Sequence, residues 1–180
     1  MRRFLAPMVI VGVMVMALPV SAAESVSGES KMTLHGRAEP CTNMSWVGTL
    51  DVSGSGDTAG TYGLALQKKD DLPASQFIDG WWRWAEYFTV YDQTFEVDDE
   101  GLIVDCEPGT ALLHGYDSGV GLPDGDFWDT GYIIEAAGPF EGLEGAKADQ
   151  LGTFTVFSDT KTTPDGKPFP VGFETTFTVE

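Results

Sequence analysis

Short runs in which hydrophobic and polar residues alternate fill most of the chain, and clusters of Gly, Asp and Pro separate them. This pattern is typical of antiparallel β-strands joined by turns. No window combines helical periodicity with capping residues, and the nearest candidate, 73–78, predicts a single turn. Residues 117–126 are expected to form a long Gly-rich loop. Strands are predicted over 31–37, 46–52, 61–67, 81–91, 94–97, 102–106, 110–116, 127–136, 147–157 and 172–180.

The number and spacing of these runs predict an all-β fold in one domain, spanning residues 31–180. We expect a single antiparallel β-barrel of about eight to nine strands, with a β-sandwich as the alternative. The final run, 172–180, alternates cleanly, which favours a paired last strand and closure of a barrel.

The longest predicted strand, 81–91, carries aromatic side chains on both faces. Such a strand is either covered on both sides or lines a cavity on one of them. The interpretation that leads to a function is a pocket for a small hydrophobic or aromatic molecule, with Arg83 or Glu86 as its polar group. The alternative is a packed core. The candidate ligand-binding residues are Trp82, Trp84, Tyr87 and Phe88.

Residues 1–23 differ from the rest because they follow the pattern of a cleavable signal peptide. Two arginines precede an uncharged apolar stretch, 4–18, and small residues suited to a signal peptidase follow at 20–23. A membrane-spanning helix needs about 20 apolar residues, more than this stretch supplies. We therefore expect a secreted or periplasmic protein with no membrane segment after cleavage and a flexible new N-terminus over 24–30.

Charge narrows the range of partners. The chain has 10 Lys and Arg against 28 Asp and Glu, and the leader contains two of the arginines, so the mature net charge is 8 − 28 = −20. A chain this acidic repels nucleic acids and anionic lipid surfaces, which excludes nucleic-acid binding. Fifteen acidic residues and no Lys or Arg occur between residues 84 and 146. This excess fits either a solvated acidic surface or the binding of cations.

Cys41 and Cys106 are the only cysteines in the sequence. Two cysteines in an exported protein usually pair, so we expect a disulfide that closes a 65-residue loop. The two cysteines and the two histidines lie too far apart in the sequence to predict a zinc site.

Residues 128–155 contain a spacing of Gly and aromatic residues that is similar to one hairpin of a known barrel family. The central sequence is G-P-F-E-G-L-E-G at 138–145, with W-D-T-G-Y at 128–132 before it and G-T-F-T at 152–155 after it. This segment resembles the G-x-F-x-G-x-x-G hairpin of allene oxide cyclase and dirigent-like β-barrels. The same spacing also suits plain turn geometry, because Gly adopts positive φ and an aromatic ring can plug a barrel end.

The resemblance implies a barrel with a hydrophobic cavity. It also implies an activity that either cyclises a reactive lipid-derived intermediate or steers the coupling of phenolic radicals. No catalytic residue of the family is carried over, because the similarity covers only the hairpin. Cyclases of this class act largely by shaping a bound substrate, which leaves little trace in a sequence.

Candidate catalytic and metal-binding residues are few. Arg83, Glu86 and His114 are the candidates for catalysis, with surface exposure or a structural role as the alternative. No hydrolase motif is present. The acidic residues of the expected Gly-rich loop suggest calcium, which prefers carboxylate oxygens, although ordinary turn formation is the alternative. The calcium candidates are Asp117, Asp124, Asp126 and Asp129.

Two functional hypotheses follow. The first is an exported barrel that binds a small hydrophobic or aromatic molecule; if it is an enzyme, we expect a cyclase or isomerase that needs no cofactor. The second is a non-enzymatic extracellular module that interacts through an acidic or aromatic surface. The sequence leaves the oligomeric state open.

Overall fold

The computed structural model describes residues 25–53, 56–69, 71–99 and 102–180, so the predicted signal peptide, 1–23, lies outside the described part. Within the described residues, no helix is long and apolar enough to cross a membrane. The elements formed there are β1 (Val26–Leu34), β2 (Met44–Ser53), β3 (Gly60–Gln67), β4 (Gln76–Ile78), β5 (Trp81–Tyr91), β6 (Ala111–Gly121), β7 (Asp126–Ala136), the 3-10 helix η1 (Gly138–Phe140), β8 (Lys147–Thr162) and β9 (Pro168–Val179).

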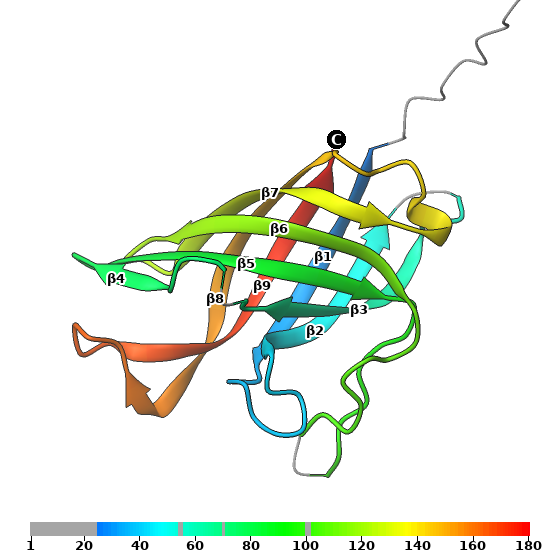
Figure 1. The fold of residues 1–180 in the computed structure, drawn as a ribbon. Coiled ribbons are helices and arrows are strands. Elements are labelled where there is room, and N and C mark those ends of the chain that lie inside the picture. Colours follow the sequence, from blue (N-terminus) through cyan, green and yellow to red (C-terminus); the bar gives the residue numbers. More distant parts are fainter. Residues whose placement is uncertain (1–24, 54–55, 70, 100–101) are drawn as a thin grey trace, which may run out of the picture.

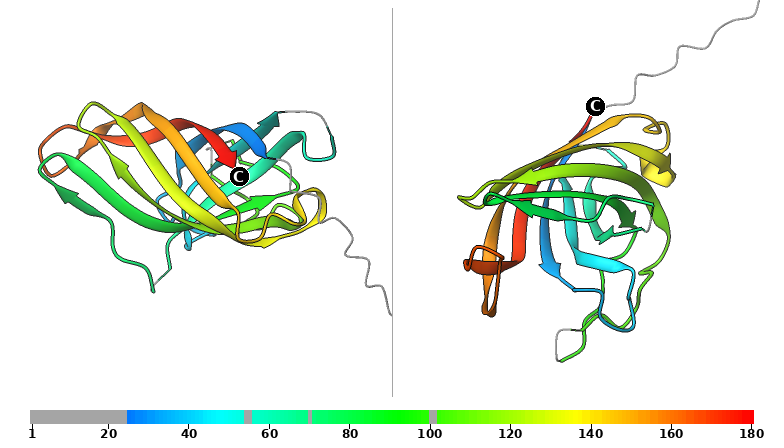
Figure 2. Two further views of the ribbon diagram at one scale, coloured as in Figure 1. Left: turned by 90° about the horizontal axis from the view of Figure 1, so that it is seen from above. Right: turned by 60° about the vertical axis from the view of Figure 1, so that its left-hand side comes forward.

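The strands form one closed antiparallel barrel (Figures 1 and 2). The sheet order is β3-β2-β1-β9-β8-β7-β6-β5-β4, and pairing of β3 with β5 closes eight of these strands into a barrel. β4 is the additional strand, and it pairs with the end of β5 that lies beyond β3. The predicted barrel is therefore confirmed, and the β-sandwich alternative is not.

β1 begins at Val26, so the expectation of a flexible segment is wrong for residues 26–30. Small polar residues suggested a tail, but the segment pairs with β2 on one side and β9 on the other. Its residues alternate between buried and exposed positions, with Val26 and Ser30 inside the barrel. The missing side chain at Gly28 lets the backbone of Asp51 on β2 lie close.

β6 continues to Gly121, so residues 117–121 are strand and not the beginning of a loop. Gly119 and Gly121 suggested a loop, but they occupy inward positions beside large rings, as does Gly115 in the part predicted as strand. A Cβ atom at Gly115 would overlap the ring of Phe88, and one at Gly119 would overlap the ring of Trp84. Glycine in a strand interior commonly marks such a close approach.

Two smaller predictions also differ from the structure. Residues 94–97 and 102–106 were expected to pair as strands, but the described residues there form only an isolated bridge between Val97 and Ile103. Residues 73–78 do not form a helical turn, because Gln76–Ile78 pairs with β5 as β4. Residues of the first segment pack in the smaller hydrophobic cluster with Tyr91, whereas β4 pairs with the wall, which outweighs local preference.

One end of the barrel is closed by the segment after β7. Phe140 in η1 is 1% exposed, and its ring contacts Tyr62 edge to face at a centroid distance of 5.2 Å. Leu143 is buried beside them in the main core. The expected turn geometry is present, since Gly138, Gly142 and Gly145 all have positive φ. Figure 1 shows η1 at one end of the barrel and β4 at the other.

A second, smaller core lies outside the barrel wall, where loops cover β2, β3 and β5. The predicted disulfide between Cys41 and Cys106 is present in this core, with a Cα–Cα distance of 5.3 Å. It joins the loop before β2 to the loop before β6, so two long connections are held against the wall. The buried members of this core are Cys41, Met44, Val47, Ala65, Tyr91 and Ile103.

Candidate ligand-binding cavity

The end of the barrel opposite Phe140 contains a cavity of about 190 Å³. Rings from five strands surround it, because alternate residues of each strand point inward. Pairs of these rings meet edge to face, at centroid distances of 4.9 Å for Trp46–Phe173, 5.2 Å for Trp82–Phe169 and 5.7 Å for Trp84–Phe127. The aromatic residues that line the cavity are Trp46, Trp82, Trp84, Phe127, Phe154, Phe169 and Phe173.

An entrance adjoins this cavity. A second hollow of about 310 Å³ shares Trp82, Phe154 and Pro170 with the cavity and extends between the β6–β7 turn and the β8–β9 hairpin. Lys167 lies at this entrance and donates a hydrogen bond from Nζ to the backbone oxygen of Pro123 at 3.2 Å. The inner cavity and this hollow therefore meet at an aromatic and proline-rich rim.

A row of polar side chains crosses the barrel interior. Six neighbouring strands each contribute one inward polar residue, while β2 and β3 contribute apolar ones. Glu86 and Asp117 face each other across β5 and β6, and Asp129 lies opposite Gln150 across β7 and β8. We call this row the polar belt; its members are Ser30, Glu86, Asp117, Asp129, Gln150 and Thr175.

The two halves of the polar belt differ in their hydrogen bonding. The neutral half is connected, because the hydroxyl oxygens of Ser30 and Thr175 are 2.7 Å apart and the Thr175 hydroxyl donates to Gln150 Oε1 at 3.3 Å. The acidic half is not. Among the described residues, both carboxyl oxygens of Asp117 and Oδ1 of Asp129 are buried without a hydrogen-bond partner. Buried polar groups are normally paired, so these atoms require an explanation.

Burial changes the acidity of this half of the belt. It raises the pKa of Asp117 to about 7. Burial and then the charge of Asp117 raise the pKa of Glu86 well above its usual value. For Asp129, burial is again the largest cause of a strongly raised pKa, followed by the charges of Asp117, Glu86 and Asp149. The acids therefore retain protons at pH values where exposed carboxyls are ionised.

The cavity contains only part of the predicted ligand-binding set. Trp82, Trp84 and the predicted polar group Glu86 line it. Phe88 lies deeper, 1% exposed, in the filled part of the interior against Phe177. Tyr87 points out of the barrel, because it alternates with Glu86 and Phe88 along β5, and Lys69 lies over its ring at 4.8 Å from the centroid.

The other two catalytic candidates also lie outside the barrel. Arg83 is exposed on the outer side of β5, opposite Val120. His114 is part-buried on the outer side of β6, stacked on Tyr87 at 5.3 Å, with Nδ1 3.1 Å from Thr89 Oγ1. Burial and then the nearby Lys69 lower the pKa of His114. Neither residue is near the acidic half of the polar belt.

The four calcium candidates do not share one site. Asp117 and Asp129 point into the barrel from β6 and β7, whereas Asp124 and Asp126 lie at the exposed turn between these strands. The loop that would have gathered them does not exist, since residues 117–121 belong to β6. Within the described part of the chain, no group of three or more His, Cys, Asp or Glu residues could hold a metal ion.

Several cavity residues were not identified from the sequence. Trp46, Phe154 and Phe169 come from three strands distant along the chain, and nothing local connects them. The signal that could have found part of the set is the alternation of strands. Phe173 and Thr175 share one face of the last strand, and that face is the inner one.

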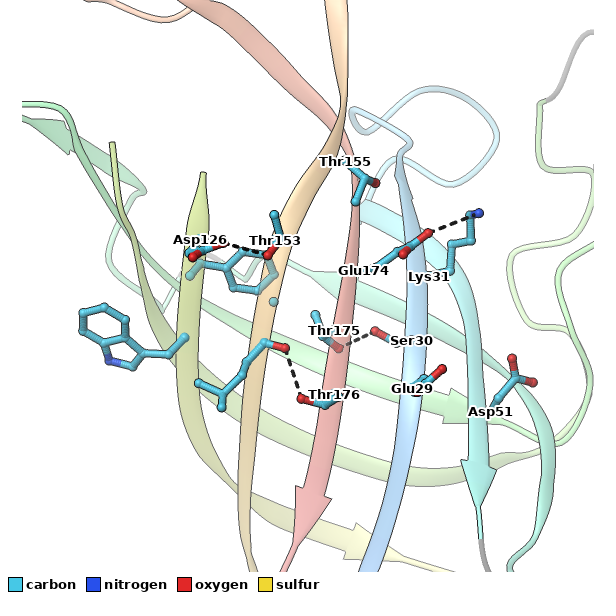
Figure 3. Close-up of a pocket in the computed structure, with 14 residues that line it drawn as sticks. Glu29, Ser30, Lys31, Asp51, Asp126, Thr153, Thr155, Glu174, Thr175 and Thr176 are labelled. Carbon is cyan, nitrogen blue, oxygen red and sulfur yellow. Dashed lines mark hydrogen bonds and ion pairs between the residues drawn. The ribbon is translucent and has the colours of Figure 1, made fainter. Parts of the chain in front are cut away.

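A larger hollow is a different feature, a groove of about 720 Å³ on the outside of the barrel. Figure 3 shows its polar residues, which come from β1, β2, β7, β8 and β9. Lys31 Nζ lies 3.3 Å from Glu174 Oε1, and the Thr153 hydroxyl donates to Asp126 at 2.7 Å. These groups are exposed and already paired, so the smaller inner cavity, with its buried unpaired acids, is the better candidate for a site.

Comparison of the chain with protein-family models, with curated proteins and with solved structures finds no match. The cavity and its chemistry are therefore the basis for any inference about function.

Proposed function

We propose that the protein binds a small, mainly aromatic or apolar molecule in the cavity of its barrel. The observation that supports this proposal is the combination of seven aromatic rings with a few inward polar groups at a cavity open at one end. Binding sites for small molecules generally have this composition: apolar walls and a small number of placed polar groups that fix orientation. The closed end is filled by Phe140, so the space for a ligand lies at the opposite end of the barrel.

The five tryptophans allow a direct test. Trp46, Trp82 and Trp84 line the cavity, whereas Trp81 and Trp128 are exposed on the outside, at 41% and 43%. Neutral indole is a suitable small probe, and the indole N–H signals of 15N-labelled protein report on each tryptophan separately. We expect added indole to shift the three cavity signals in a saturable manner and to leave the two outer signals in place.

Either of two results would contradict the proposal: no saturable shift of the cavity signals, or saturation confined to Trp81 and Trp128. A matched pair of variants sharpens the test. Trp84→Ala should weaken indole binding, while Trp128→Ala, which removes a ring of the same kind from the outer face, should leave it unchanged.

The second hypothesis, an interaction module, is supported by one observation. Trp128 and Leu151 lie directly opposite each other on the outer side of β7 and β8, exposed at 43% and 66%. Adjacent exposed apolar side chains are typical of contact surfaces. Indole shifts confined to Trp128 would favour this hypothesis over the cavity.

Activity of the allene oxide cyclase or dirigent type stays a prediction of the hairpin resemblance. If the protein is an enzyme, Glu86 and Asp129 are the carboxyl groups placed to reach a bound molecule, since both line the cavity. A protonated carboxyl could supply the proton for a cofactor-free isomerisation.

A further inference from the structure

The acidic half of the polar belt restricts what the cavity can accept, and this restriction builds on the proposed binding function. Asp129 is 7% exposed and lines the cavity, with Oδ1 buried and unpaired among the described residues. Glu86 lines the same cavity and keeps some exposed surface. Asp117 stands directly behind Glu86 across the β5–β6 pair. Two carboxyl groups thus line one side of the cavity floor, and a third lies next to Glu86 on the neighbouring strand.

Among the described residues that line the cavity, no cationic side chain balances these groups. The described residues that line the cavity include no Lys, Arg or His. The other belt residues, Gln150, Thr175 and Ser30 on β8, β9 and β1, cannot be ionised, and Trp46 and Leu66 face the cavity from β2 and β3. A buried carboxylate is costly unless it is paired. The partner must therefore be a proton or a cation that comes with the ligand.

We infer that the cavity takes a small organic cation, whose ammonium group lies against Glu86 and Asp129 and whose apolar body lies among the aromatic rings. Two features of the protein favour this ligand: the aromatic walls of the cavity and the negative charge of the chain. Trp rings attract cations through their π faces, and ammonium ligands are commonly held in aromatic cages. The strongly acidic chain also raises the local concentration of cations around the entrance.

A metal ion fits the same carboxyls less well. Calcium needs six to eight oxygen ligands, and seven of the residues around this cavity present aromatic rings. Within the described residues, no group of three or more potential ligands is close enough to hold a metal. An organic cation needs fewer oxygen contacts and gains from the rings.

Three indole probes of similar size and different charge test the inference: tryptamine, a cation; indole-3-ethanol, which is neutral; and indole-3-acetate, an anion. Isothermal titration calorimetry on the full-length mature protein at pH 8 should give at least tenfold tighter binding of tryptamine than of indole-3-ethanol. The anion should bind more weakly than both.

Proton linkage provides an independent readout. Burial raises the pKa of all three acids, so they regain protons as the pH falls. The advantage of tryptamine over indole-3-ethanol should therefore shrink to less than threefold at pH 5, and tryptamine binding near pH 6 should release protons. Indole-3-ethanol should bind with the same affinity at both pH values.

Variants separate charge recognition from binding in general. Asp129→Asn and Glu86→Gln should each reduce the ratio of tryptamine affinity to indole-3-ethanol affinity about tenfold. Glu135→Gln, which neutralises an exposed acid on the outside of β7, is the matched control and should leave this ratio and both affinities unchanged.

Equal affinities for tryptamine and indole-3-ethanol at pH 8 would overturn the inference and leave the proposed binding function standing. Failure of tryptamine to bind, while neutral indole still shifts the cavity tryptophans, would have the same meaning. If neither indole nor any charged or neutral derivative binds, both the inference and the proposed function fail.

Discussion

The two ends of the barrel interior are built from the same eight strands and the same inward alternation, yet one is filled and the other is hollow. At the closed end, Phe88, Phe140 and Val90 are each 1% exposed or less. At the open end, the inward residues of the same β5 strand are Trp82 and Trp84, which are only part-buried around a cavity. The acidic half of the polar belt lies along this transition.

The two ends show how one barrel can contain both a core that stabilises the fold and a cavity that can bind a ligand. Close packing at the closed end contributes stability through burial of apolar surface. The open end places three carboxyls in a poorly solvated interior, which costs stability. Sites of this kind are commonly destabilising on their own and are maintained by the well-packed remainder of the fold. Each prediction below perturbs one end and compares it with the other.

The largest expected effect is a loss of stability with rising pH, caused by the open end. Folded Asp117 keeps its proton up to about pH 7, whereas an unfolded Asp releases it near pH 4. The folded state thus holds more protons inside this window. The free energy of unfolding should be highest below about pH 4, fall as the pH rises to about 7 and remain low above it.

The size of this loss should be on the order of 4 kcal/mol from Asp117 alone, with Glu86 and Asp129 contributing in the same direction. Urea denaturation at intervals from pH 4 to pH 8 measures it. Stability that rises across this window would contradict the buried position of the acids.

Removing the buried ring that plugs the closed end should lower the free energy of unfolding by nearly as much as ionisation of Asp117. Phe140→Ala deletes a buried ring that contacts Tyr62, and such truncations cost about 3–5 kcal/mol through lost burial and the void left behind. The loss should be present at all pH values, unlike the loss caused by the acids. Trp81→Ala, at an exposed position on the outside, is the control and should cost less than about 1 kcal/mol.

Neutralising one acid should reverse part of the loss of stability that occurs as the pH rises. Asp117→Asn keeps the shape of the side chain and removes its charge, so we expect a gain of about 2 kcal/mol at pH 8 and none at pH 4. The gain is partial because the amide has no better partners than the carboxyl. Urea denaturation of both proteins at the two pH values is sufficient, and a less stable variant at pH 8 would mean that Asp117 has a stabilising partner.

The sequence predicted the parts of this comparison that depend on local pattern. The bounds of β5 follow from its alternation and were predicted at Trp81–Tyr91, as observed. Phe140 as a plug followed from the Gly and aromatic spacing, and the cysteine pair followed from composition. Each of these signals lies within one segment of the chain or in the number of residues of one type.

The cavity could not be predicted in the same way, because its residues meet only through barrel closure. The polar belt takes one residue from each of six strands, and no short stretch of sequence contains two of its hydrogen-bonded members. Gly119 was misleading, since glycine normally indicates a turn and this residue fell in the expected loop 117–126. In β6 it makes room for the ring of Trp84, as Gly115 does for the ring of Phe88, a role visible only once these rings are placed.

These two glycines provide the finest test of the difference between the ends. Both face inward on β6, and an added Cβ would overlap the ring of Phe88 at Gly115 and the ring of Trp84 at Gly119. Phe88 is enclosed and cannot move away, so Gly115→Ala should cost about 2 kcal/mol. At Gly119 the added Cβ would also meet Asp129 Cβ at 2.8 Å. Because Trp84 borders the cavity and can turn into it, Gly119→Ala should still cost less than Gly115→Ala, about 1 kcal/mol.

The same pair should behave in the opposite order when binding is measured. The displaced Trp84 ring would occupy cavity space, so Gly119→Ala should weaken indole binding by about tenfold, whereas Gly115→Ala should leave it within twofold. Urea denaturation and indole titration of both variants check the two orders together. Equal effects of the two substitutions on both measurements would mean that the two ends of the barrel accommodate an added methyl group equally well. The open end would then have no space into which a ring or a ligand can move.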